Sequence, residues 1–547
     1  MRMVLKKNLL FFSGIFFFLT LLSSCGEEAP EIISIDPRIG LMGDVLTITG
    51  RGFGEERDES YITIAGTPPT SSSYISWEDS EITVRVPEFG EAGLIYVHRG
   101  GKKSNPALFA NLLSLPEPVR GPEADYNPRI NSITPASGPV GTLVTISGSN
   151  FGSSREASGV FFAWNAESSL LAPAGSQAPD FIEVSETEFG YDYWSEREIR
   201  VRVPDGVISG NLEVRTPRGI SRPVFFDASG MLNTKVYRDK RTYMLSYSAD
   251  IIINLAYSPN TLYLWMPRPA VSASQRNVSV LARNIEPFVE NYRGTSLFQL
   301  INASSGARWG VDLSYLVEVY AVETTIRNTN TVRLNEPTPV GTVYLLPSDL
   351  IPSDDPAIKA QADAIIARER LTYVKAQRIY QWLISSMSIQ DAPLPGGVLE
   401  ALEEKEADSY RAALLFCALA RAVDIPALPV AGVLVDRQMN TIKHCWAEFW
   451  LDGFGWIPLD PALGAGAAPE VFNLREDHRE YYFGNLDNQR VAFTRGETFL
   501  QPMAPRGRTV TRNREYSLQN IWEEAVGGLE SYSSLWSDVT ITGMYIQ

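Results

Sequence analysis

Three side chains of this 547-residue chain have the types expected of a nucleophile, a base and an orienting acid. Ser409 precedes a long apolar stretch, His444 lies in HCWAEFW, and Asp460 follows in WIPLDPALG. A serine hydroxyl attacks a carbonyl group when a neutral imidazole takes its proton and a carboxylate holds the ring. These three residues therefore have the chemistry of acyl transfer, provided that the fold brings them together.

The periodicity around these residues predicts the elements that must position them. The stretch from Ser409 to about Val423 is apolar on nearly all sides, which predicts a buried helix with Ser409 at its start. Alternation from His444 to Trp450 predicts a strand, and the following DGFG turn returns the chain so that Asp460 lies near His444. Trp446 and Glu448 share the strand face of His444, and we predict that they bind a ligand.

This combination of a buried helix, an Ile-Pro-Ala turn, a His-x-Trp-x-Glu strand and a Trp-x-x-x-Asp-Pro return resembles the transglutaminase-like domains of the papain-like superfamily. The resemblance covers about 350–497, within a predicted domain at 346–497. It implies a Cys at the start of the helix, a His on the strand and an Asp on the next strand. His444 and Asp460 match these positions, whereas Ser409 stands at the position of the Cys.

The serine leaves two functions open for this domain. The leading hypothesis is a non-catalytic cleft that binds peptide, protein or glycan, because a helix start and an imidazolium activate a thiol but not a hydroxyl. Asp408 and Ser409 would then cap the helix. The alternative is a serine-dependent amidase or peptidase, in which Ser409 attacks, His444 relays the proton and Asp460 orients the ring.

The remaining cysteines and the histidines do not point to another centre. Cys417 lies about 12 Å along the helix from Ser409, and Cys445 points to the strand face opposite His444. We expect both to be buried free thiols, although a disulfide between them stays open. The three histidines are scattered, so the sequence predicts neither a metal site nor a cofactor.

The first residues are predicted to form an export signal. A basic head, the apolar run LLFFSGIFFFLTLL and the ending LSSCG resemble the lipobox of bacterial lipoproteins. The resemblance implies a signal peptide at 1–24 and a lipidated Cys25, carrying palmitate-type chains, with a linker at 25–29. The protein would then be anchored in the cell envelope, facing the periplasm or the exterior, and Gly26 favours the outer membrane. Cleavage removes three positive charges and shifts the net charge from −16 to −19, which argues against nucleic acid as a partner.

A β-rich pattern occurs twice after the signal. IISIDPRIGLMGDVLTITGRGFG begins at Ile32 and INSITPASGPVGTLVTISGSNFG begins at Ile130. Both resemble the IPT/TIG immunoglobulin-like domain, which implies two such domains at 30–113 and 127–228. Trp77 and Trp194 recur in both copies, so we expect them in the two cores. These domains either serve as a spacer or bind glycan or protein at the surface, which is a third possible function.

The fold class that we predict is multidomain, with all-β immunoglobulin-like sandwiches followed by an α+β transglutaminase-like domain. A further β-sandwich is expected at 232–345, ahead of the helical core. The C-terminal extension at 498–547 is expected to form a short helix, with Ile521, Trp522 and Ala525 on its docking face, followed by a strand. The predicted partners are the membrane, through Cys25, and a peptide, protein or glycan.

Overall fold

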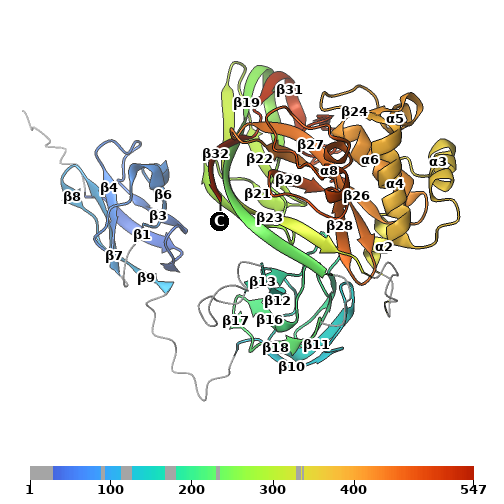
Figure 1. The fold of residues 1–547 in the computed structure, drawn as a ribbon. Coiled ribbons are helices and arrows are strands. Elements are labelled where there is room, and N and C mark those ends of the chain that lie inside the picture. The colour runs from blue at the N-terminus through green and yellow to red at the C-terminus, as the bar shows by residue number, and fades with distance from the viewer. Residues whose placement is uncertain are drawn as a thin grey trace, which may run out of the picture. The chain divides into compact units, whose positions relative to one another are not determined.

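The computed structural model describes residues 29–87, 93–112, 126–166, 180–228, 234–327, 334 and 338–546. The predicted signal peptide and Cys25 lie outside the described residues. The chain divides into two compact units, Met1–Asp125 and Tyr126–Gln547, and each unit is considered by itself (Figure 1). Within the described ranges, no helix has both the length and the apolar character needed to cross a bilayer.

The first unit is an immunoglobulin-like module built from short strands around one apolar core. Its two sheets have the orders β1-β3-β6-β5 and β2-β9-β7-β4, and β8 pairs with β7. Alternating residues such as Leu46 and Ile48 are fully buried between the sheets. The strands are β1 (Glu31–Asp36), β2 (Ile39–Gly40), β3 (Val45–Arg51), β4 (Tyr61–Ile64), β5 (Tyr74–Trp77), β6 (Glu81–Arg85), β7 (Gly93–Arg99), β8 (Lys102–Lys103) and β9 (Ala107–Asn111).

The second unit begins with a module of the same design. Its sheets have the orders β10-β11-β15-β14 and β13-β12-β16-β17, with β18 beside β16. A register shift between Ile130 and Ser132 reproduces the one between Ile32 and Ser34. The strands are β10 (Arg129–Thr134), β11 (Leu143–Ser149), β12 (Gly159–Trp164), β13 (Asp180–Glu183), β14 (Tyr191–Trp194), β15 (Glu198–Arg202), β16 (Gly210–Thr216), β17 (Gly219–Ile220) and β18 (Val224–Phe226).

The region expected to be a β-sandwich forms one continuous eight-stranded sheet. Its axis is β19, a strand of 34 residues that curves through the unit and pairs with several partners in turn (Figure 1). The sheet therefore extends beyond the predicted boundary at 345. Its strands are β19 (Thr234–Pro267), β20 (Gln275–Arg283), β21 (Val289–Tyr292), β22 (Thr295–Ile301), β23 (Arg308–Thr325), β30 (Arg508–Val510), β31 (Glu523–Trp536) and β32 (Thr540–Ile546).

The predicted C-terminal helix is wrong. In the described part of 498–547 the chain forms β30, β31 and β32, and no helix. Trp522 and Ala525 are buried as predicted, but they pack on the curved sheet. Gly527 and Gly528 explain the outcome, because they disfavour a helix and let β31 approach β19: a Cβ at Gly528 would lie 2.2 Å from the Tyr257 carbonyl oxygen.

The transglutaminase-like domain consists of helices on one side of a four-stranded sheet with the order β28-β27-β26-β29. One face of the helix at 372–386 is apolar, and its residues Ala376, Ile379, Tyr380 and Leu383 are buried. The elements are α2 (Pro339–Val343), α3 (Pro356–Ile366), α4 (Thr372–Ser386), β24 (Ser388–Ile389), α5 (Val398–Glu404), β25 (Glu406–Ala407), α6 (Ser409–Arg421), β26 (Ala427–Val435), β27 (Thr441–Leu451), β28 (Gly455–Leu459), α7 (Pro461–Ala465), α8 (His478–Tyr481) and β29 (Arg490–Arg495).

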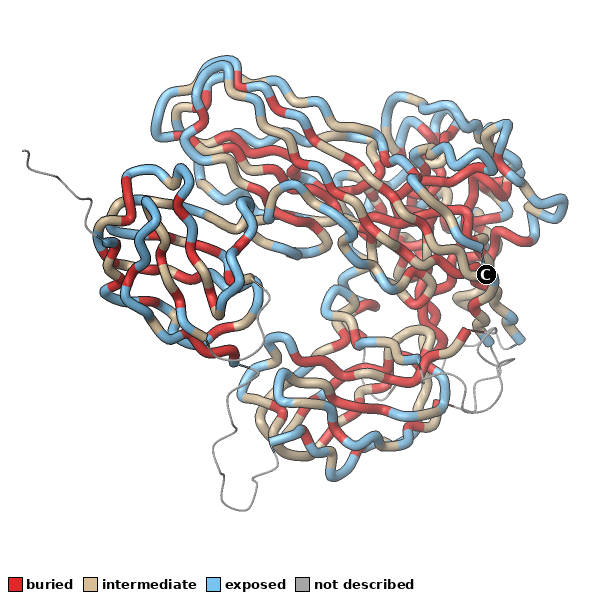
Figure 2. The backbone as a smooth tube through the Cα atoms, turned by 90° about the vertical axis from the view of Figure 1, so that its left-hand side faces the viewer, coloured by how far each residue is buried: buried red, intermediate tan, exposed pale blue. Residues whose placement is uncertain are grey.

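The two faces of this sheet join different cores. Ala447 and Phe449 of β27 pack with α6, which is buried along almost its whole length. Figure 2 shows that buried residues fill the interior of the second unit, while exposed residues lie on its outer loops. Trp446 and Trp450, on the other face, pack in one cluster with Val140 of the second immunoglobulin-like module. Helix α6 and the second module therefore cover opposite faces of the same sheet.

Candidate functional site

The start of α6 is capped by Asp408, not by Ser409. Asp408 Oδ1 accepts a hydrogen bond from the Arg411 backbone N–H at 2.8 Å, as an N-cap carboxylate does. Its other oxygen accepts from the Leu394 N–H at 2.8 Å and is paired with Arg514 of the C-terminal extension. Ser409 is consequently the first residue of the helix, and its side chain is not needed as a cap.

The Ser409 hydroxyl is close to the strand that carries the imidazole. Its Oγ accepts a hydrogen bond from the Cys445 backbone N–H at 3.4 Å, and the side chain is partly exposed. Within the described residues, no hydrogen bond joins Ser409 to the ring of His444. The structure therefore brings Ser409 next to the strand of His444, with its hydroxyl directed at the backbone of Cys445.

His444 and Asp460 form the pair that the sequence predicts. The His444 Nε2 atom lies 2.9 Å from Asp460 Oδ2, and both side chains are buried. Asp460 Oδ1 accepts from the Leu463 N–H at 3.0 Å, so the carboxylate also caps α7. Burial alone would raise the pKa of Asp460, but the charge and hydrogen bond of His444, the charge of Arg490 and the Leu463 N–H outweigh burial and lower this pKa to about 2.

Arg490 is a further member of the site that sequence reasoning missed. Its Nη1 donates to Asp460 Oδ2 at 3.0 Å, so the arginine and the imidazole share one carboxylate oxygen. Its Nη2 donates to Asp487 at 2.9 Å, and its guanidinium lies 4.9 Å from the centre of the Trp446 ring. A signal was present in the sequence, because an arginine at the start of the apolar strand RVAFTR must find buried partners.

The two predicted binding residues separate in space. Trp446 is buried beside His444, with ring centres 6.4 Å apart, and Arg490 covers its face. Glu448 keeps the same strand face but pairs with Arg495, whose Nη2 lies 2.5 Å from Glu448 Oε2. Glu448 thereby lines a separate cleft between the domains of the second unit, which Ser409, His444 and Asp460 do not line.

Both described cysteines are buried free thiols, as expected. Burial raises the pKa of Cys417 to about 12, and burial followed by the charge of Asp408 raises the pKa of Cys445 further. Neither sulfur would ionise near neutral pH, so neither offers a thiolate nucleophile. In the ranges that the structure describes, no group of three or more His, Cys, Asp or Glu side chains converges as metal ligands would.

Comparisons with known families agree with this architecture. Residues 359–461 match the Transglutaminase-like superfamily, and residues 30–110 and 128–166 match the IPT/TIG domain. These matches cover the site helix, the His444 strand and Asp460, and parts of both immunoglobulin-like modules. They do not include the curved sheet or β29.

Individual relatives match only parts of the chain. An uncharacterized protein of Haemophilus influenzae is 27% identical over 179 residues, which are 26% of this chain and 48% of that protein. A cyclomaltodextrin glucanotransferase of Paenibacillus macerans is 33% identical over 85 residues, 16% of this chain and 12% of the enzyme. This chain therefore spans less than half the length of these curated relatives.

Solved structures resemble the chain at low similarity. The crystal structure of a candidate cysteine protease from Cytophaga hutchinsonii has 16% sequence identity and a TM-score of 0.35, covering 58% of this chain and 92% of that chain. The family matches identify the parts of the molecule: a multidomain chain with two IPT/TIG domains and a transglutaminase-like domain.

Proposed function

We propose that this chain is an exported, lipid-anchored protein of the bacterial cell envelope, whose transglutaminase-like domain binds peptide, protein or glycan without catalysis. One observation carries the proposal. The hydroxyl at the nucleophile position accepts a hydrogen bond from the Cys445 N–H at 3.4 Å and, among the described residues, has none with His444.

The electrostatics of the site favour the same conclusion. A thiol at a helix start beside an imidazolium ionises readily, whereas a serine hydroxyl needs a general base that becomes positively charged as it takes the proton. Asp460 would have to stabilise that imidazolium. Arg490 already holds the same carboxylate oxygen at 3.0 Å, so the negative charge available to the imidazolium is reduced.

A second candidate is a serine-dependent amidase or peptidase that uses Ser409, His444 and Asp460. The observation that favours it is the buried imidazole–carboxylate pair at 2.9 Å. Because Nε2 faces Asp460, the ring would take a proton through Nδ1, and Ser409 would have to rotate away from Cys445 to reach it. Catalysis would proceed by attack of Oγ on an acyl carbon, with His444 passing the proton to the leaving group.

Labelling with a serine-directed fluorophosphonate separates these two functions. We expect no labelling of the wild-type protein above the level of Ser409→Ala. The matched control is Ser386→Ala, since Ser386 is an exposed serine at the end of α4. Labelling that is lost in Ser409→Ala and His444→Ala but kept in Ser386→Ala would establish the enzyme and contradict the proposal.

The geometry of the cleft can be examined by restoring the sulfur. We expect Ser409→Cys to react with iodoacetamide at neutral pH faster than Ser386→Cys, because the helix start and His444 would lower the pKa of the new thiol. Equal rates for the two variants would mean that the surroundings of Ser409 no longer resemble a thiol site.

Lipid anchoring rests on the sequence around Cys25. Growth with an alkyne-tagged fatty acid is expected to label the wild-type protein, and Cys25→Ala is expected to abolish this labelling and release the protein from the membrane fraction. Equal membrane retention by Cys25→Ala would contradict the anchor.

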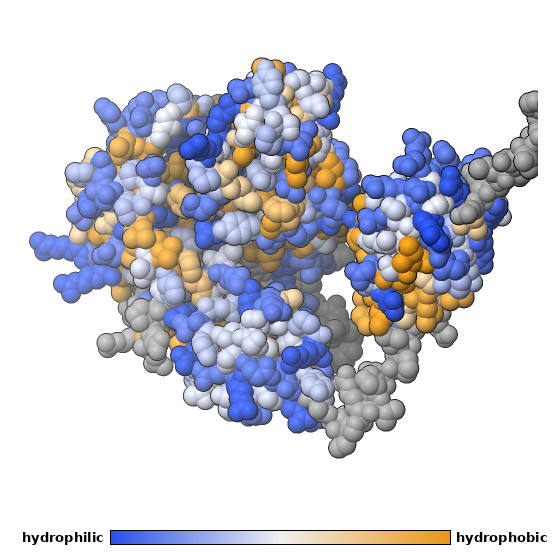
Figure 3. Space-filling view, turned by 180° about the vertical axis from the view of Figure 1, so that it is seen from behind, coloured by the Kyte–Doolittle hydropathy of each residue, from blue (hydrophilic) through white to orange (hydrophobic). Residues whose placement is uncertain are grey.

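A third candidate is a surface binder that acts through the IPT/TIG domains. The first unit exposes apolar side chains, among them Met42 (68% exposed), Leu108 (63%) and Leu94 (41%), and Figure 3 shows hydrophobic side chains gathered on its surface. A patch of this kind commonly marks an interaction site. Loss of ligand binding in Leu108→Ser, but not in a variant of the second module, would favour this function.

A further inference from the structure

A large cavity of the second unit lies away from Ser409. It has a volume of about 1420 Å³ and lies between the second IPT/TIG domain, the curved sheet and the transglutaminase-like sheet. Small-molecule pockets typically measure about 300–1,000 Å³. This cleft is therefore large enough for a chain of several linked units.

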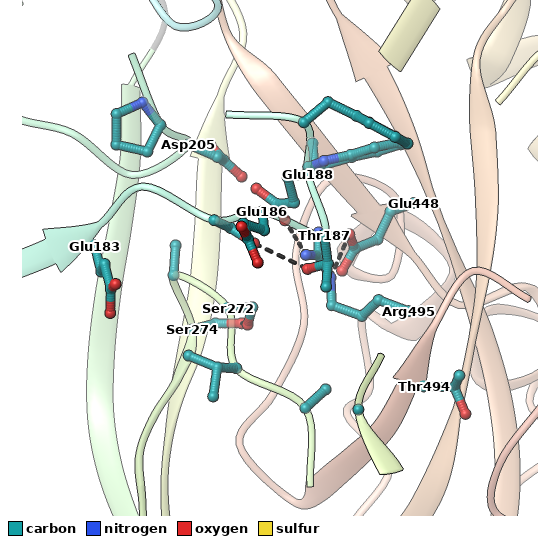
Figure 4. Close-up of a pocket in the computed structure, with 18 of the residues that line it drawn as sticks. Glu183, Glu186, Thr187, Glu188, Asp205, Ser272, Ser274, Glu448, Thr494 and Arg495 are labelled. Atoms are coloured by element: carbon teal, nitrogen blue, oxygen red, sulfur yellow. Dashed lines mark hydrogen bonds and ion pairs between the residues drawn. The ribbon is translucent and has the colours of Figure 1, made fainter. Parts of the chain in front are cut away.

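Ion pairs and hydrogen bonds between domains hold the cleft walls in place. Arg495 binds both Glu448 and Glu188, and these two carboxylates gather around it (Figure 4). Lys235 donates to Asp205 and to the Trp456 carbonyl oxygen, both at 2.6 Å. A cleft that is already formed loses little conformational entropy when a ligand binds.

Two buried polar groups on these walls have no partner in the described protein. The hydroxyl of Tyr237 and the indole N–H of Trp456 make no hydrogen bond there, although the two residues are only 3% and 2% exposed. Both residues line the cleft. Because the two atoms themselves are buried, a small local movement of the wall would bring these donors to oxygen acceptors of a bound molecule.

Positive and negative charges are nearly equal in number along the cleft. Seven carboxylates and eight cationic side chains line it, so its charge is nearly balanced although the whole chain carries −16. A nucleic acid needs a strongly basic surface, and a basic peptide needs a strongly acidic one. The balance favours a neutral ligand with many hydroxyl groups, since carboxylates accept from hydroxyls and guanidinium groups donate to them.

Aromatic side chains at the rim complete this chemistry. Phe499 is 52% exposed and Tyr292 is 40% exposed, and both line the cleft. Sugar rings carry an apolar C–H face that packs on such rings, while their hydroxyls meet polar side chains. Glu183 suits the second role because no ion pair or hydrogen bond engages its carboxylate in the described part of the chain.

From these observations we propose that the cleft between the three domains binds a neutral oligosaccharide segment of several sugar units. The inference deepens the proposed function and rests on it for the statement that the chain is a binding protein. The inference names the class of ligand and the site where it binds. Glu448 lines this cleft, whereas Ser409, His444 and Asp460 do not.

The test measures binding of the full chain from Gly26 to a panel of neutral oligosaccharides of four to eight units, with α-glucan, β-glucan, xylan and mannan backbones, by calorimetry. One class is expected to bind. Phe499→Ala and Tyr292→Ala should each weaken binding roughly fivefold to tenfold, as the loss of one aromatic contact does. Glu183→Gln should weaken it about tenfold, through loss of a charge-assisted hydrogen bond.

Matched controls are available on exposed surfaces outside the cleft. Phe288→Ala and Tyr257→Ala remove rings that are 53% and 61% exposed, and Glu530→Gln removes an exposed carboxylate. These variants should bind as the wild-type protein does, and thermal melting should show that all six variants are folded.

Three results would overturn the inference: no binding by any oligosaccharide class, binding that the three cleft variants leave unchanged, or cleft-dependent binding of a lysine-rich or acidic peptide instead. Fluorophosphonate labelling of the same preparations keeps the two proposals apart. A failure to bind sugars would leave the absence of labelling intact, and labelling through Ser409 would leave a positive result for the cleft intact.

Discussion

The two IPT/TIG domains share an internal frame and differ in what surrounds it. Trp77 donates its indole N–H to the Phe53 carbonyl oxygen at 3.1 Å, and Trp194 donates to that of Phe151 at 3.2 Å. Both tryptophans pack against their cores, as expected for residues that recur in the repeat. The repeated residues therefore specify how each module folds.

The surfaces of the two modules have diverged at equivalent positions. Met42 of the first module is 68% exposed, whereas its counterpart Val140 is 2% exposed and packs in the cluster that contains Trp450. Arg85 and Arg202 reach equivalent carbonyl oxygens at 3.5 and 3.4 Å, but only Arg202 is buried. The second module therefore packs against the transglutaminase-like domain through Val140, whereas the equivalent position of the first module is exposed.

A carboxylate introduced at position 140 or at position 42 should affect the stability of the two modules very differently. Val140→Asp would bury an unpaired carboxylate against Trp450 and should lower the free energy of unfolding of the second unit by roughly 3 kcal/mol or more. Met42→Asp should change the stability of the first unit by less than about 0.5 kcal/mol. Urea unfolding, followed by hydrogen exchange of peptides from each unit, measures both effects. Similar losses in the two variants would contradict the difference in docking.

The module frame could be predicted because local constraints recur in the sequence. A Cβ at Gly50 would lie 2.0 Å from the Glu31 carbonyl oxygen, and one at Gly148 would lie 1.9 Å from that of Arg129. Only glycine fits such an approach, so the repeat carries its own structural reason. The helix at 409–421 was predictable from its nearly continuous apolar sequence, which agrees with the burial of every residue from Arg411 to Arg421. The strand that carries His444 was predictable from its alternating sequence pattern and the turn that follows it.

The cleft and the full charge network of the site could not be predicted in this way. Glu188 and Arg495 are 307 residues apart, and neither lies in a motif that points to the other. Arg490 reaches Asp460 across 30 residues through the packing of β29. At the C-terminus, helical spacing of Ile521, Trp522 and Ala525 was outweighed by pairing with β19, a tertiary effect that local periodicity does not contain.

Acid should lower the stability of the second unit, because it protonates the carboxylate of Asp460. The pKa of Asp460 is about 2 in the folded state, below the ordinary value near 3.9 of an unfolded chain. Its stabilisation is therefore complete above about pH 5 and is lost as the pH falls through 2, a change of roughly 2–3 kcal/mol. Unfolding of the second unit between pH 5 and 2 measures this loss.

Two variants sharpen the acid prediction. Asp460→Asn should remove much of the dependence on pH, and Asp354→Asn should leave it unchanged because Asp354 is exposed. An unchanged acid profile in Asp460→Asn would mean that the pairing with His444 and Arg490 contributes little to stability.

The shared tryptophan hydrogen bond should contribute equally to both modules. Trp77→Phe and Trp194→Phe each remove one N–H donor, which should cost about 1 kcal/mol in the module concerned. Local opening free energies from hydrogen exchange provide the comparison. A cost that differs by much more than this between the modules would show that docking has altered the frame of the second one.

The smallest expected effect concerns a position that titrates in only one module. His98 of β7 stacks on Tyr61 with ring centres 4.6 Å apart, and the strand register gives Arg215 as its counterpart. Burial, followed by the charge of Lys103, lowers the pKa of His98 below its ordinary value of 6.5. Since the folded state disfavours the protonated ring, the first unit should be most stable above pH 6.5 and lose stability as the pH falls through the lowered pKa.

Thermal melting of the first unit from pH 8 to 5 should show this loss of stability. The dependence on pH should be weaker in Lys103→Gln, and His98→Asn should remove the contribution of His98. A first unit that instead gained stability on acidification would mean that the ring is better stabilised when charged, and the packing on Tyr61 would then have the opposite electrostatic effect from the one inferred.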